Sequence, residues 1–324
     1  MASFPLLLPL FIPFLLFSFV SCYSWNDVKL WCNQTPNPQP CEYFLPGDRK
    51  LLEASSPASK ANVVVAKDGS GKYTTVSGRY AVYVKSGVYN EQVEIKAKNI
   101  MLVGDGIGKT IIRGSKSVGG GTTTFRSATV DVVGDGFIAQ DITFRNTAGA
   151  ANHQAVALRS GSDLSVFYRC SFEGYQDTLY VHSDRQFYRE CNIYGTVDFI
   201  FGNAAVVFQK VTASSDLKAV QNSVKTYLGR PWKQYSRTVF MKTYLDGLIN
   251  PAGWLEWSGD FALNTLYYGE YMNTGPGSST ARRVKWKDYR VITMASEASK
   301  FAVANFIAGN TWLPSTKVPF TSSL

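Results

Sequence analysis

Short apolar runs alternate with polar turns along most of the chain from Val63 onward. The runs are rich in Val, Ile, Phe and Tyr, and Gly, Asn, Asp and Ser separate them. No stretch before the C-terminal region keeps a helical period for more than about three turns. The runs lie at 63–66, 80–85, 99–104, 110–114, 128–133, 137–144, 155–159, 205–209 and 237–241. This pattern predicts an all-β fold built from many short strands.

Two segments in the middle of the chain are alike and lie 21 residues apart. They are SVFYRCSFEGYQD at 165–177 and QFYRECNIYGTVD at 186–198. A repeat near 20 residues favours a β-solenoid over a sandwich, with each repeat forming one coil. Equivalent residues of neighbouring coils then lie one above the other, about 4.8 Å apart.

The same spacing separates two pairs of residues, Cys170 from Cys191 and Asp177 from Asp198. Stacked cysteines have Cα atoms within the roughly 4.4–6.8 Å that a disulfide requires. Stacked carboxylates repel each other unless they share a proton or have a chemical task. We therefore expect the cysteines to crosslink two coils and the aspartates to be functional, although spacing alone does not fix disulfide connectivity.

The residue types present restrict the possible chemistry. Only His153 and His182 occur, and the chain lacks a G-x-S-x-G nucleophile motif. No group of His, Cys and Asp residues has metal-ligand spacing. With these classes of site excluded, catalysis by carboxylate side chains is the chemistry that the sequence leaves.

Two glutamines extend the aspartate pair into a ladder. Gln154 lies 22 residues before Gln176, which precedes Asp177, so the predicted ladder crosses three coils and ends at Asp198. This set suits acyl transfer, because amides stabilise an oxyanion while one carboxylate attacks and the other donates a proton. Arg230, in LGRPW, is expected to hold the attacking carboxylate ionised and oriented.

Each of these residues also has a purely structural interpretation. Stacked Asp and Gln side chains cap turns in solenoids, and Arg230 is then a structural ion-pair partner. Trp232 and Trp254 are either packed aromatics or a platform for a sugar. Gly104 to Thr110 is similar to a phosphate loop, but Val103 stands where that motif needs glycine, so we expect a tight turn there.

Composition indicates an anionic partner. The 324 residues carry a net charge of +9, with 18 Tyr and 7 Trp. No basic helix, zinc spacing or RNA-binding signature supports nucleic acid as that partner. An acidic polysaccharide fits both the charge and the aromatic residues, and a merely soluble basic protein is the alternative.

The N-terminal region predicts export. An apolar run from Leu6 to Val20 ends in small residues, which is typical of a cleaved secretory signal, with an uncleaved anchor as the alternative. We assign residues 1–22 to the signal, 23–60 to a remnant pro-region and processing linker, and 61–324 to the β-helix. Export permits disulfides, and Asn33 begins a glycosylation sequon.

Five motifs occur in one order along the chain. They are GVYNE at 87–91, QAVALR at 154–159, QDTL at 176–179, DFIFG at 198–202 and LGRPW at 228–232. As a set they resemble the signature motifs of plant pectin methylesterases. The resemblance runs from about Val63 through NPAGW, LYYGEY and FIAGNTWL near the C-terminus.

The resemblance implies a right-handed parallel β-helix that hydrolyses the methyl esters of homogalacturonan in the cell wall. It implies that Asp198 is the nucleophile. Asp177 would protonate the departing methanol and then activate the water that resolves the acyl-enzyme. Gln154 and Gln176 would form the anion hole, and Arg230 would hydrogen-bond Asp198.

Further expectations follow from the resemblance. Thr124, Arg230 and Trp232, together with Gln154, would contact the substrate, and Cys170–Cys191 would match a disulfide of the family. No metal or organic cofactor is implied. The implied partner is pectin, bound by a secreted, cell-wall monomer, and a proteinaceous pectinesterase inhibitor is a further candidate partner.

The chain departs from the family pattern in three places. Residues 31–52 resemble the two ends of an inhibitor-like pro-region without the helical bundle between them. Residues 73–85 join two strands where the family has a helix-containing cap. Residues 206–218 lack a stretch longer than one coil. No catalytic residue is lost, but a shortened stack threatens the placement of Arg230 relative to Asp198.

Three other functions compete with an esterase. Paired carboxylates also serve retaining glycoside hydrolases, so a β-helical hydrolase or lyase acting on the same polymer is one alternative. A pectin-binding relic, impaired by the internal deletions, is another. A secreted inhibitor is a third idea, although only a remnant of such a domain is present.

Overall fold

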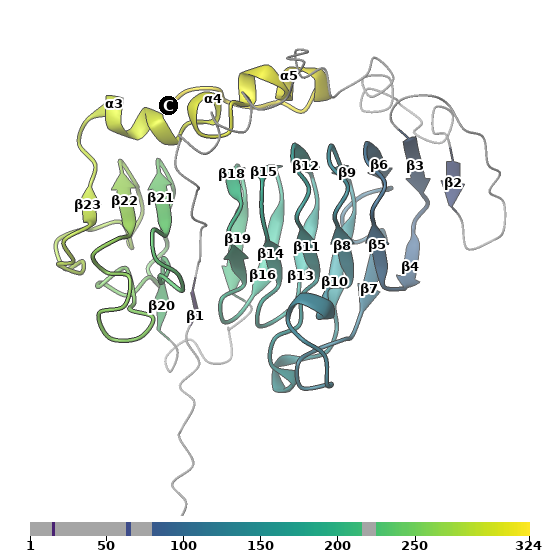
Figure 1. The fold of residues 1–324 in the computed structure, drawn as a ribbon, viewed down its shortest axis with the longest axis horizontal. Helices are drawn as coiled ribbons and strands as arrows, with labels where there is room; N and C mark the ends of the chain where they lie inside the picture. The colour runs from purple at the N-terminus through teal and green to yellow at the C-terminus, as the bar shows by residue number, and fades with distance from the viewer. Residues whose placement is uncertain (1–14, 17–62, 66–79, 216–224) are drawn as a thin grey trace, which may run out of the picture.

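The structure, a computed structural model, describes residues 15–16, 63–65, 80–215 and 225–324. Its strands form coils that stack along one axis, so each coil adds one strand to each of three parallel sheets (Figure 1). This arrangement confirms the predicted parallel β-helix. The predicted signal, the pro-region and the junction after Tyr73 lie largely outside the described residues.

The first stack of coils ends at Ser215 and contains three sheets. The seven-stranded sheet contains β2 (Val63–Val65), β3 (Tyr80–Val84), β6 (Ile100–Val103), β9 (Ile138–Gln140), β12 (Ser165–Tyr168), β15 (Arg185–Arg189) and β18 (Ala205–Gln209). The six-stranded sheet contains β4 (Gly87–Asn90), β7 (Thr110–Gly114), β10 (Thr143–Asn146), β13 (Ser171–Glu173), β16 (Asn192–Gly195) and β19 (Thr212–Ser215). The five-stranded sheet contains β5 (Val93–Ile95), β8 (Val130–Val132), β11 (Leu158–Ser160), β14 (Leu179–Val181) and β17 (Ile200–Gly202).

Coil length explains why the sequence repeat is clear only in the middle of the chain. Leu158 pairs with Leu179, and Leu179 with Ile200, so these coils are 21 residues long. Leu158 pairs with Val130 on its other side, which makes that coil 28 residues long. Loops of different length between strands therefore hide the repeat outside this region.

Single residues in the left-handed conformation turn the chain between the seven-stranded and six-stranded sheets. Asp141, Arg169, Glu190 and Lys210 occupy equivalent positions with φ between 50° and 57°. The predicted turn after Gly104 is also confirmed, since the Lys109 N–H donates to the Gly106 carbonyl at 3.0 Å.

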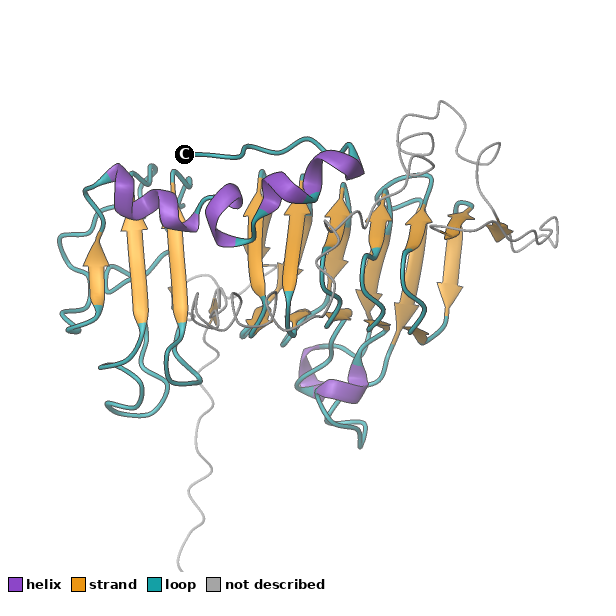
Figure 2. Cartoon of the chain, turned by 45° about the horizontal axis from the view of Figure 1, so that its top comes forward, coloured by secondary structure: helices purple, strands orange, loops and turns teal. Residues whose placement is uncertain are grey.

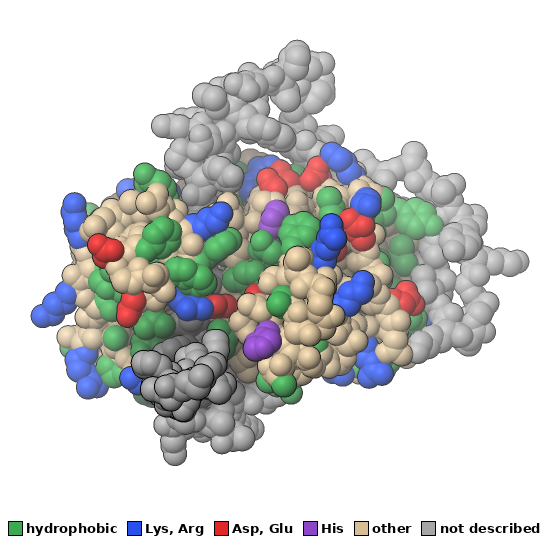
Figure 3. Space-filling view, turned by 60° about the horizontal axis from the view of Figure 1, so that its bottom comes forward, with side chains coloured by type: hydrophobic (Ala, Val, Ile, Leu, Met, Phe, Trp, Pro, Cys, Tyr) green, Lys and Arg blue, Asp and Glu red, His purple; other side chains and the backbone are tan. Residues whose placement is uncertain are grey.

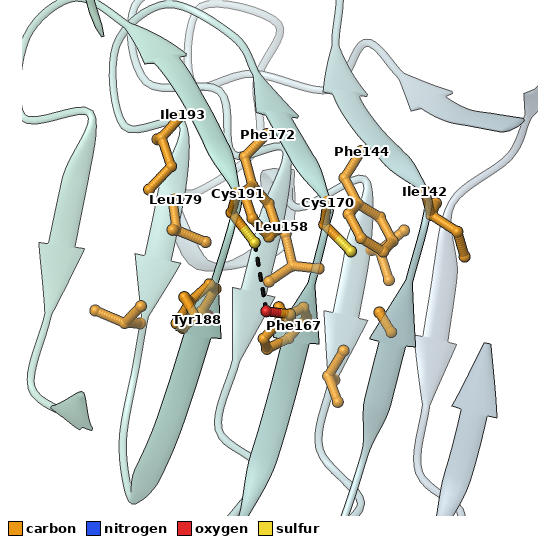
Figure 4. Packing of buried hydrophobic residues seen from close by; sticks show 14 of the residues in the cluster. Ile142, Phe144, Leu158, Phe167, Cys170, Phe172, Leu179, Tyr188, Cys191 and Ile193 are labelled. Atoms are coloured by element: carbon orange, nitrogen blue, oxygen red, sulfur yellow. Dashed lines mark hydrogen bonds between the residues drawn. The ribbon is translucent and has the colours of Figure 1, made fainter. Parts of the chain in front are cut away.

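Aromatic side chains from successive coils stack inside the first stack (Figure 4). The rings of Phe144 and Phe172 are 5.6 Å apart, those of Phe167 and Tyr188 are 4.6 Å apart, and the Tyr188 and Phe208 rings are 4.9 Å apart. Burying each such ring stabilises the fold by roughly 1.5–3 kcal/mol. The ladder of rings therefore holds the register that positions the turns at the coil edges.

A second, shorter stack follows residue 225 and is separate from the first (Figure 1). It contains β20 (Thr226–Tyr227), which pairs with β1 (Leu15–Leu16), and the sheet of β21 (Arg237–Met241), β22 (Tyr267–Tyr271) and β23 (Tyr289–Val291). Within the described ranges, no strand of the first stack pairs with β20 to β23. The break lies where the sequence predicts missing coil residues.

Short helices near the C-terminus run along one side of both stacks (Figures 1 and 2). They are α3 (Ala295–Ala298), η4 (Ser299–Phe301), α4 (Val303–Phe306), η5 (Gly309–Thr311) and α5 (Leu313–Thr316). Two further 3-10 turns, η2 (Phe125–Ser127) and η3 (Ala150–Asn152), lie in loops of the first stack. In the described part of the chain, no helix has the length and apolar character needed to cross a membrane.

Candidate active site

Asp177 and Asp198 occupy equivalent turns of neighbouring coils, just before β14 and β17. The Asp177 N–H donates to the Val197 carbonyl at 3.0 Å, and Leu179 pairs with Ile200 in the sheet that follows. Both aspartates have positive φ, 63° and 47°, a left-handed conformation that Asp adopts more readily than most residues. The sequence repeat therefore places the two side chains on adjacent levels, as predicted.

The Asp177 carboxyl is suited to hold and donate a proton. Asp177 is only 8% exposed. Burial raises its pKa well above the ordinary value, the negative charge of Asp198 raises it further, and the positive charge of Arg230 lowers it. A carboxyl that keeps its proton beyond the usual range is the typical general acid of a carboxylate pair.

Arg230 contacts Asp198 through two hydrogen bonds. Its Nε donates to Oδ1 at 3.2 Å and its Nη2 donates to Oδ2 at 2.5 Å. The Arg230 side chain is 20% exposed and that of Asp198 is 13% exposed. A bidentate pair of this kind fixes the orientation of the carboxylate. The predicted Arg230–Asp198 contact is therefore present, although the two residues belong to different stacks.

The backbone around Arg230 is anchored within the second stack. The Leu228 N–H donates to the Gly253 carbonyl at 2.7 Å, and the Leu255 N–H donates to the Gly229 carbonyl at 3.0 Å. The side chain of Leu228 is fully buried. The guanidinium therefore extends from a fixed loop toward the first stack.

The glutamines lie on the predicted ladder. The Ala155 N–H donates to the Gln176 carbonyl at 3.1 Å, so the residue after Gln154 bonds to the coil that carries Gln176 and Asp177. Both glutamines are half-buried. Their side chains have the partial solvent access that a role toward substrate requires.

Thr124 lies in the loop that precedes β8, one residue before the exposed ring of Phe125. Its carbonyl accepts hydrogen bonds from the N–H and Oγ of Ser127. The Phe125 ring covers the guanidinium of Arg159, 3.4 Å from the ring centroid, and meets the His182 ring edge-on at 5.6 Å. The loop is thereby attached to the five-stranded sheet beside β14.

The predicted tryptophans have different environments. Trp232 is half-buried, with Lys233 Nζ 5.0 Å from its ring centroid. Trp254 is buried, and its ring is tilted against that of Tyr268 with the centroids 4.4 Å apart. Its Nε1 donates to Glu270 Oε1 at 3.2 Å. Trp254 is thus a core residue, while Trp232 remains a candidate for substrate contact.

Three aromatic residues near the site were not predicted. Trp257, 43% exposed, lies over Arg230 with the guanidinium carbon 4.1 Å from its ring centroid. Tyr180 and Phe201 stack at 4.3 Å on the five-stranded sheet. Each of these two follows an aspartate of the pair by three residues, and that regularity is a signal from which they were predictable.

The predicted disulfide between Cys170 and Cys191 is wrong in this structure, in which both residues are free thiols. The Cys191 Sγ donates to the Phe167 carbonyl at 3.3 Å, and the Cys170 Sγ to the Tyr168 carbonyl at 3.5 Å. Figure 4 shows the two side chains pointing the same way. Parallel stacking repeats a side-chain direction from coil to coil, whereas a disulfide needs side chains that converge.

The molecular face that Figure 3 turns forward is hollowed near its middle. Hydrophobic side chains gather beside the hollow, and charged side chains of both signs lie at its edge. Among the described residues, no group of three or more His, Cys, Asp or Glu side chains is placed to hold a metal ion.

Comparison with known proteins identifies relatives of the chain. The pectinesterase family model matches residues 62–213 and 210–310. Pectinesterase 2 of Citrus sinensis is 66% identical over 325 residues, covering 86% of this chain and 63% of that protein. Probable pectinesterase/pectinesterase inhibitor 17 of Arabidopsis thaliana is 62% identical over 323 residues, with the same coverage.

A solved structure gives the same result. The pectin methylesterase from carrot superposes with a TM-score of 0.79 at 51% identity, covering 82% of this chain and 98% of that chain. This chain spans just under two thirds of the length of the two curated relatives above. The alignment with the Citrus protein is 325 residues long but covers only 86% of this 324-residue chain. The Citrus protein therefore has residues within the aligned region that have no counterpart in this chain. The two matched pieces of the family model overlap at residues 210–213, next to the break between the stacks.

Proposed function

Because the chain belongs to the pectinesterase family, we propose that it hydrolyses the methyl esters of pectin to pectate and methanol. The observation that carries the proposal is the pair Asp177–Asp198, with Arg230 bound to Asp198. One carboxyl group is held by a cation and the other tends to keep its proton. This is the asymmetry that nucleophile and acid roles require.

In the first half of the proposed reaction, an Asp198 carboxylate oxygen attacks the ester carbonyl carbon of the uronate. The carbonyl oxygen becomes an oxyanion, which the side-chain amides of Gln154 and Gln176 stabilise by donating hydrogen bonds. The bond to the methoxy oxygen breaks, and Asp177 transfers its proton to that oxygen. Methanol leaves, and Asp198 is acylated as a mixed anhydride.

In the second half, water attacks the carbonyl carbon of the anhydride. Asp177, now a carboxylate, takes a proton from the water. The bond to the Asp198 oxygen breaks, which restores the Asp198 carboxylate and releases the uronate product. Asp177 regains its proton, so both residues finish in their starting states.

Aromatic and polar side chains beside the pair would bind the polymer. We assign substrate contacts to Thr124, Trp232 and the newly found Trp257, with Tyr180 and Phe201 as a stacked surface next to the aspartates. Flat aromatic faces suit the apolar faces of sugar rings. The net charge of +9 fits a product that is a polyanion.

The proposed setting is the plant cell wall. Residues 61–324 would act there as a secreted monomeric esterase without a cofactor, and a proteinaceous pectinesterase inhibitor is a candidate partner. Family membership and the apolar run at 6–20 support this placement.

Methanol release from highly esterified pectin tests the proposal, with reducing ends measured in the same samples. The full chain should release methanol without reducing ends, and Asp198→Asn should lower the rate by a factor on the order of 10⁴. Asp141→Asn is the matched control. Asp141 also has positive φ and a bidentate arginine partner, Arg169, but lies in a different turn of the coil.

Other outcomes identify the alternatives. Full activity of Asp198→Asn would exclude the nucleophile assignment. Reducing ends in place of methanol would indicate a glycoside hydrolase or lyase. Binding to pectin without methanol release from the unaltered chain would support the impaired relic, which the break between the two stacks favours.

A further inference from the structure

The active-site groups are divided between the two stacks. Asp177 and Asp198 lie in turns of the first stack, and Arg230 extends from the second. Within the described residues, no strand pairing joins the stacks. Some other contact must therefore keep Arg230 in register with the aspartates.

Residues 295–324, here called the C-terminal strap, begin on the second stack. Tyr267 Oη donates to Glu297 Oε1 at 2.6 Å, and the Tyr267 ring lies 5.0 Å from that of Phe301. Ala298 is fully buried in a cluster with Tyr271 and Ile292. The first helix of the strap is thus fixed to β22 and the residues after β23.

The middle of the strap packs on the first stack. Five of its apolar residues are at most 2% exposed and cover the outer face of the seven-stranded sheet. The strap residues in this cluster are Val303, Ile307, Trp312, Leu313 and Val318. Their partners on the sheet and its turns include Met101, Val103, Ile138, Val166 and Phe187.

The end of the strap bonds to the last strand of the seven-stranded sheet and then returns to the second stack. Gln209 Nε2 donates to the Thr321 carbonyl at 2.7 Å, and the Thr321 N–H donates to Gln209 Oε1 at 2.9 Å. Gln209 ends β18, the strand at the break. Leu324 then packs against the same cluster as Ala298.

We propose that the C-terminal strap positions Arg230 against Asp198 by clamping the two stacks together across the break. The clamp itself is independent of the proposed esterase function; only its expected effect on the reaction rate rests on that function. The helices of the strap are four residues long or less, too short to be stable alone, so their order depends on packing against both stacks. A displacement near 1 Å at a catalytic group costs about a hundredfold in rate, so a loosened clamp has a measurable effect.

Two changes loosen the clamp without touching the site. Gln209→Ala removes both bonds to Thr321 and also the hydrogen bond that Arg189 Nη1 donates to Gln209 Oε1 at 3.0 Å. Deletion of residues 319–324 removes the returning end of the strap and leaves the Arg189–Gln209 bond in place. Thr321→Ala is the matched control, because Gln209 binds the backbone of Thr321 and not its side chain. Circular dichroism establishes that each variant is folded.

The primary measurement is the titration of the Asp177 carboxyl by NMR with ¹³C-labelled aspartate, assigned through Asp177→Asn. The charged groups that act on Asp177 are Asp198 and Arg230. The charge of Asp177 in turn raises the pKa of the nearby Tyr180 hydroxyl. Since Arg230 lowers the pKa of Asp177, displacing Arg230 should move this titration to higher pH. Loss of stability alone does not have that effect.

The expected result is a titration at higher pH and a kcat reduced roughly tenfold to a hundredfold in both loosened variants, with Thr321→Ala unchanged. An unchanged Asp177 titration in folded Gln209→Ala and in the deletion variant would overturn the proposal. If the deletion variant does not fold, Gln209→Ala alone decides. A shifted titration in a chain that releases no methanol would retain the clamp and reject the esterase function.

Discussion

Arg230 Nη2 lies 2.5 Å from Asp198 Oδ2, and this ion pair joins two stacks of coils between which no described strands pair. The contact is bidentate along one edge of the guanidinium, since Nε also donates to Oδ1. Both side chains are mostly buried, so the interaction is less screened than a surface pair. The pair is the point at which the integrity of the fold and the proposed chemistry depend on each other.

Replacing Arg230 with lysine should therefore lower activity strongly. Lysine keeps the positive charge but cannot bind both carboxylate oxygens with a rigid planar group. We expect kcat to fall roughly tenfold to a hundredfold with a smaller change in KM, measured as methanol release. Arg169→Lys is the matched control, because Arg169 makes the same bidentate contact with Asp141, in a turn that does not carry the pair. Equal losses in both variants would indicate a structural effect only.

The pH dependence of activity should report the Asp177 carboxyl. The proposed acid must be protonated to release methanol, and burial together with the charge of Asp198 raises its pKa. Activity should thus persist at pH values above the range in which carboxyl groups ordinarily ionise. It should fall as the pH rises through the raised pKa of Asp177. Arg230→Gln removes the charge that lowers this pKa, so the alkaline limb of kcat/KM should move to higher pH in the residual activity. A shift to lower pH would contradict the assignment of Asp177 as the acid.

Ionisation of Asp177 should also lower the stability of the folded chain. Its folded-state pKa lies above its unfolded value of about 3.9, so the folded state binds more protons between the two values. The free energy of unfolding therefore falls as pH rises from about 4 through the raised pKa. Asp177→Asn cannot ionise, so its melting temperature should exceed that of the unaltered chain by an amount that grows over this range. Thermal melts at several pH values test this, and a constant difference would contradict it.

Much of this arrangement was predictable from residue spacing. The 21-residue repeat predicts that Asp177 stacks with Asp198, because coils of equal length place equivalent residues one above the other. The ladder from Gln154 to Gln176 follows from the same register. These contacts are set by backbone hydrogen bonds between neighbouring coils, and so they can be read from the chain.

Other features depend on geometry that spacing does not encode. The sulfurs of Cys170 and Cys191 are one repeat apart, but the parallel register points them the same way. Trp257 reaches Arg230 through a loop of irregular length. The break after Ser215 was expected, because residues of a coil are missing there. The strap that bridges the break was not predicted, because its contacts with the sheet join residues more than a hundred positions apart in the sequence.

Trp257 should support Arg230 through its ring. A cation over an aromatic face contributes about 0.5–1 kcal/mol when exposed and about 2 kcal/mol when desolvated. Trp257→Ala is therefore expected to lower kcat/KM roughly twofold to thirtyfold, and Trp257→Phe should restore part of it. If phenylalanine restored nothing, the contact would not depend on an aromatic face.

The two core cysteines should behave as unreactive thiols. Both are essentially unexposed, and burial raises the pKa of the Cys170 thiol well above its ordinary value. An alkylating reagent should modify neither residue in the native chain and both after unfolding without a reductant, as peptide mass spectrometry can show. Cys191→Ala should lower the free energy of unfolding by about 1–2 kcal/mol, because it leaves a small vacancy in the core. Removing a disulfide typically lowers it by about 2–5 kcal/mol. Alkylation that required prior reduction would show instead that the two stacked sulfurs are bonded.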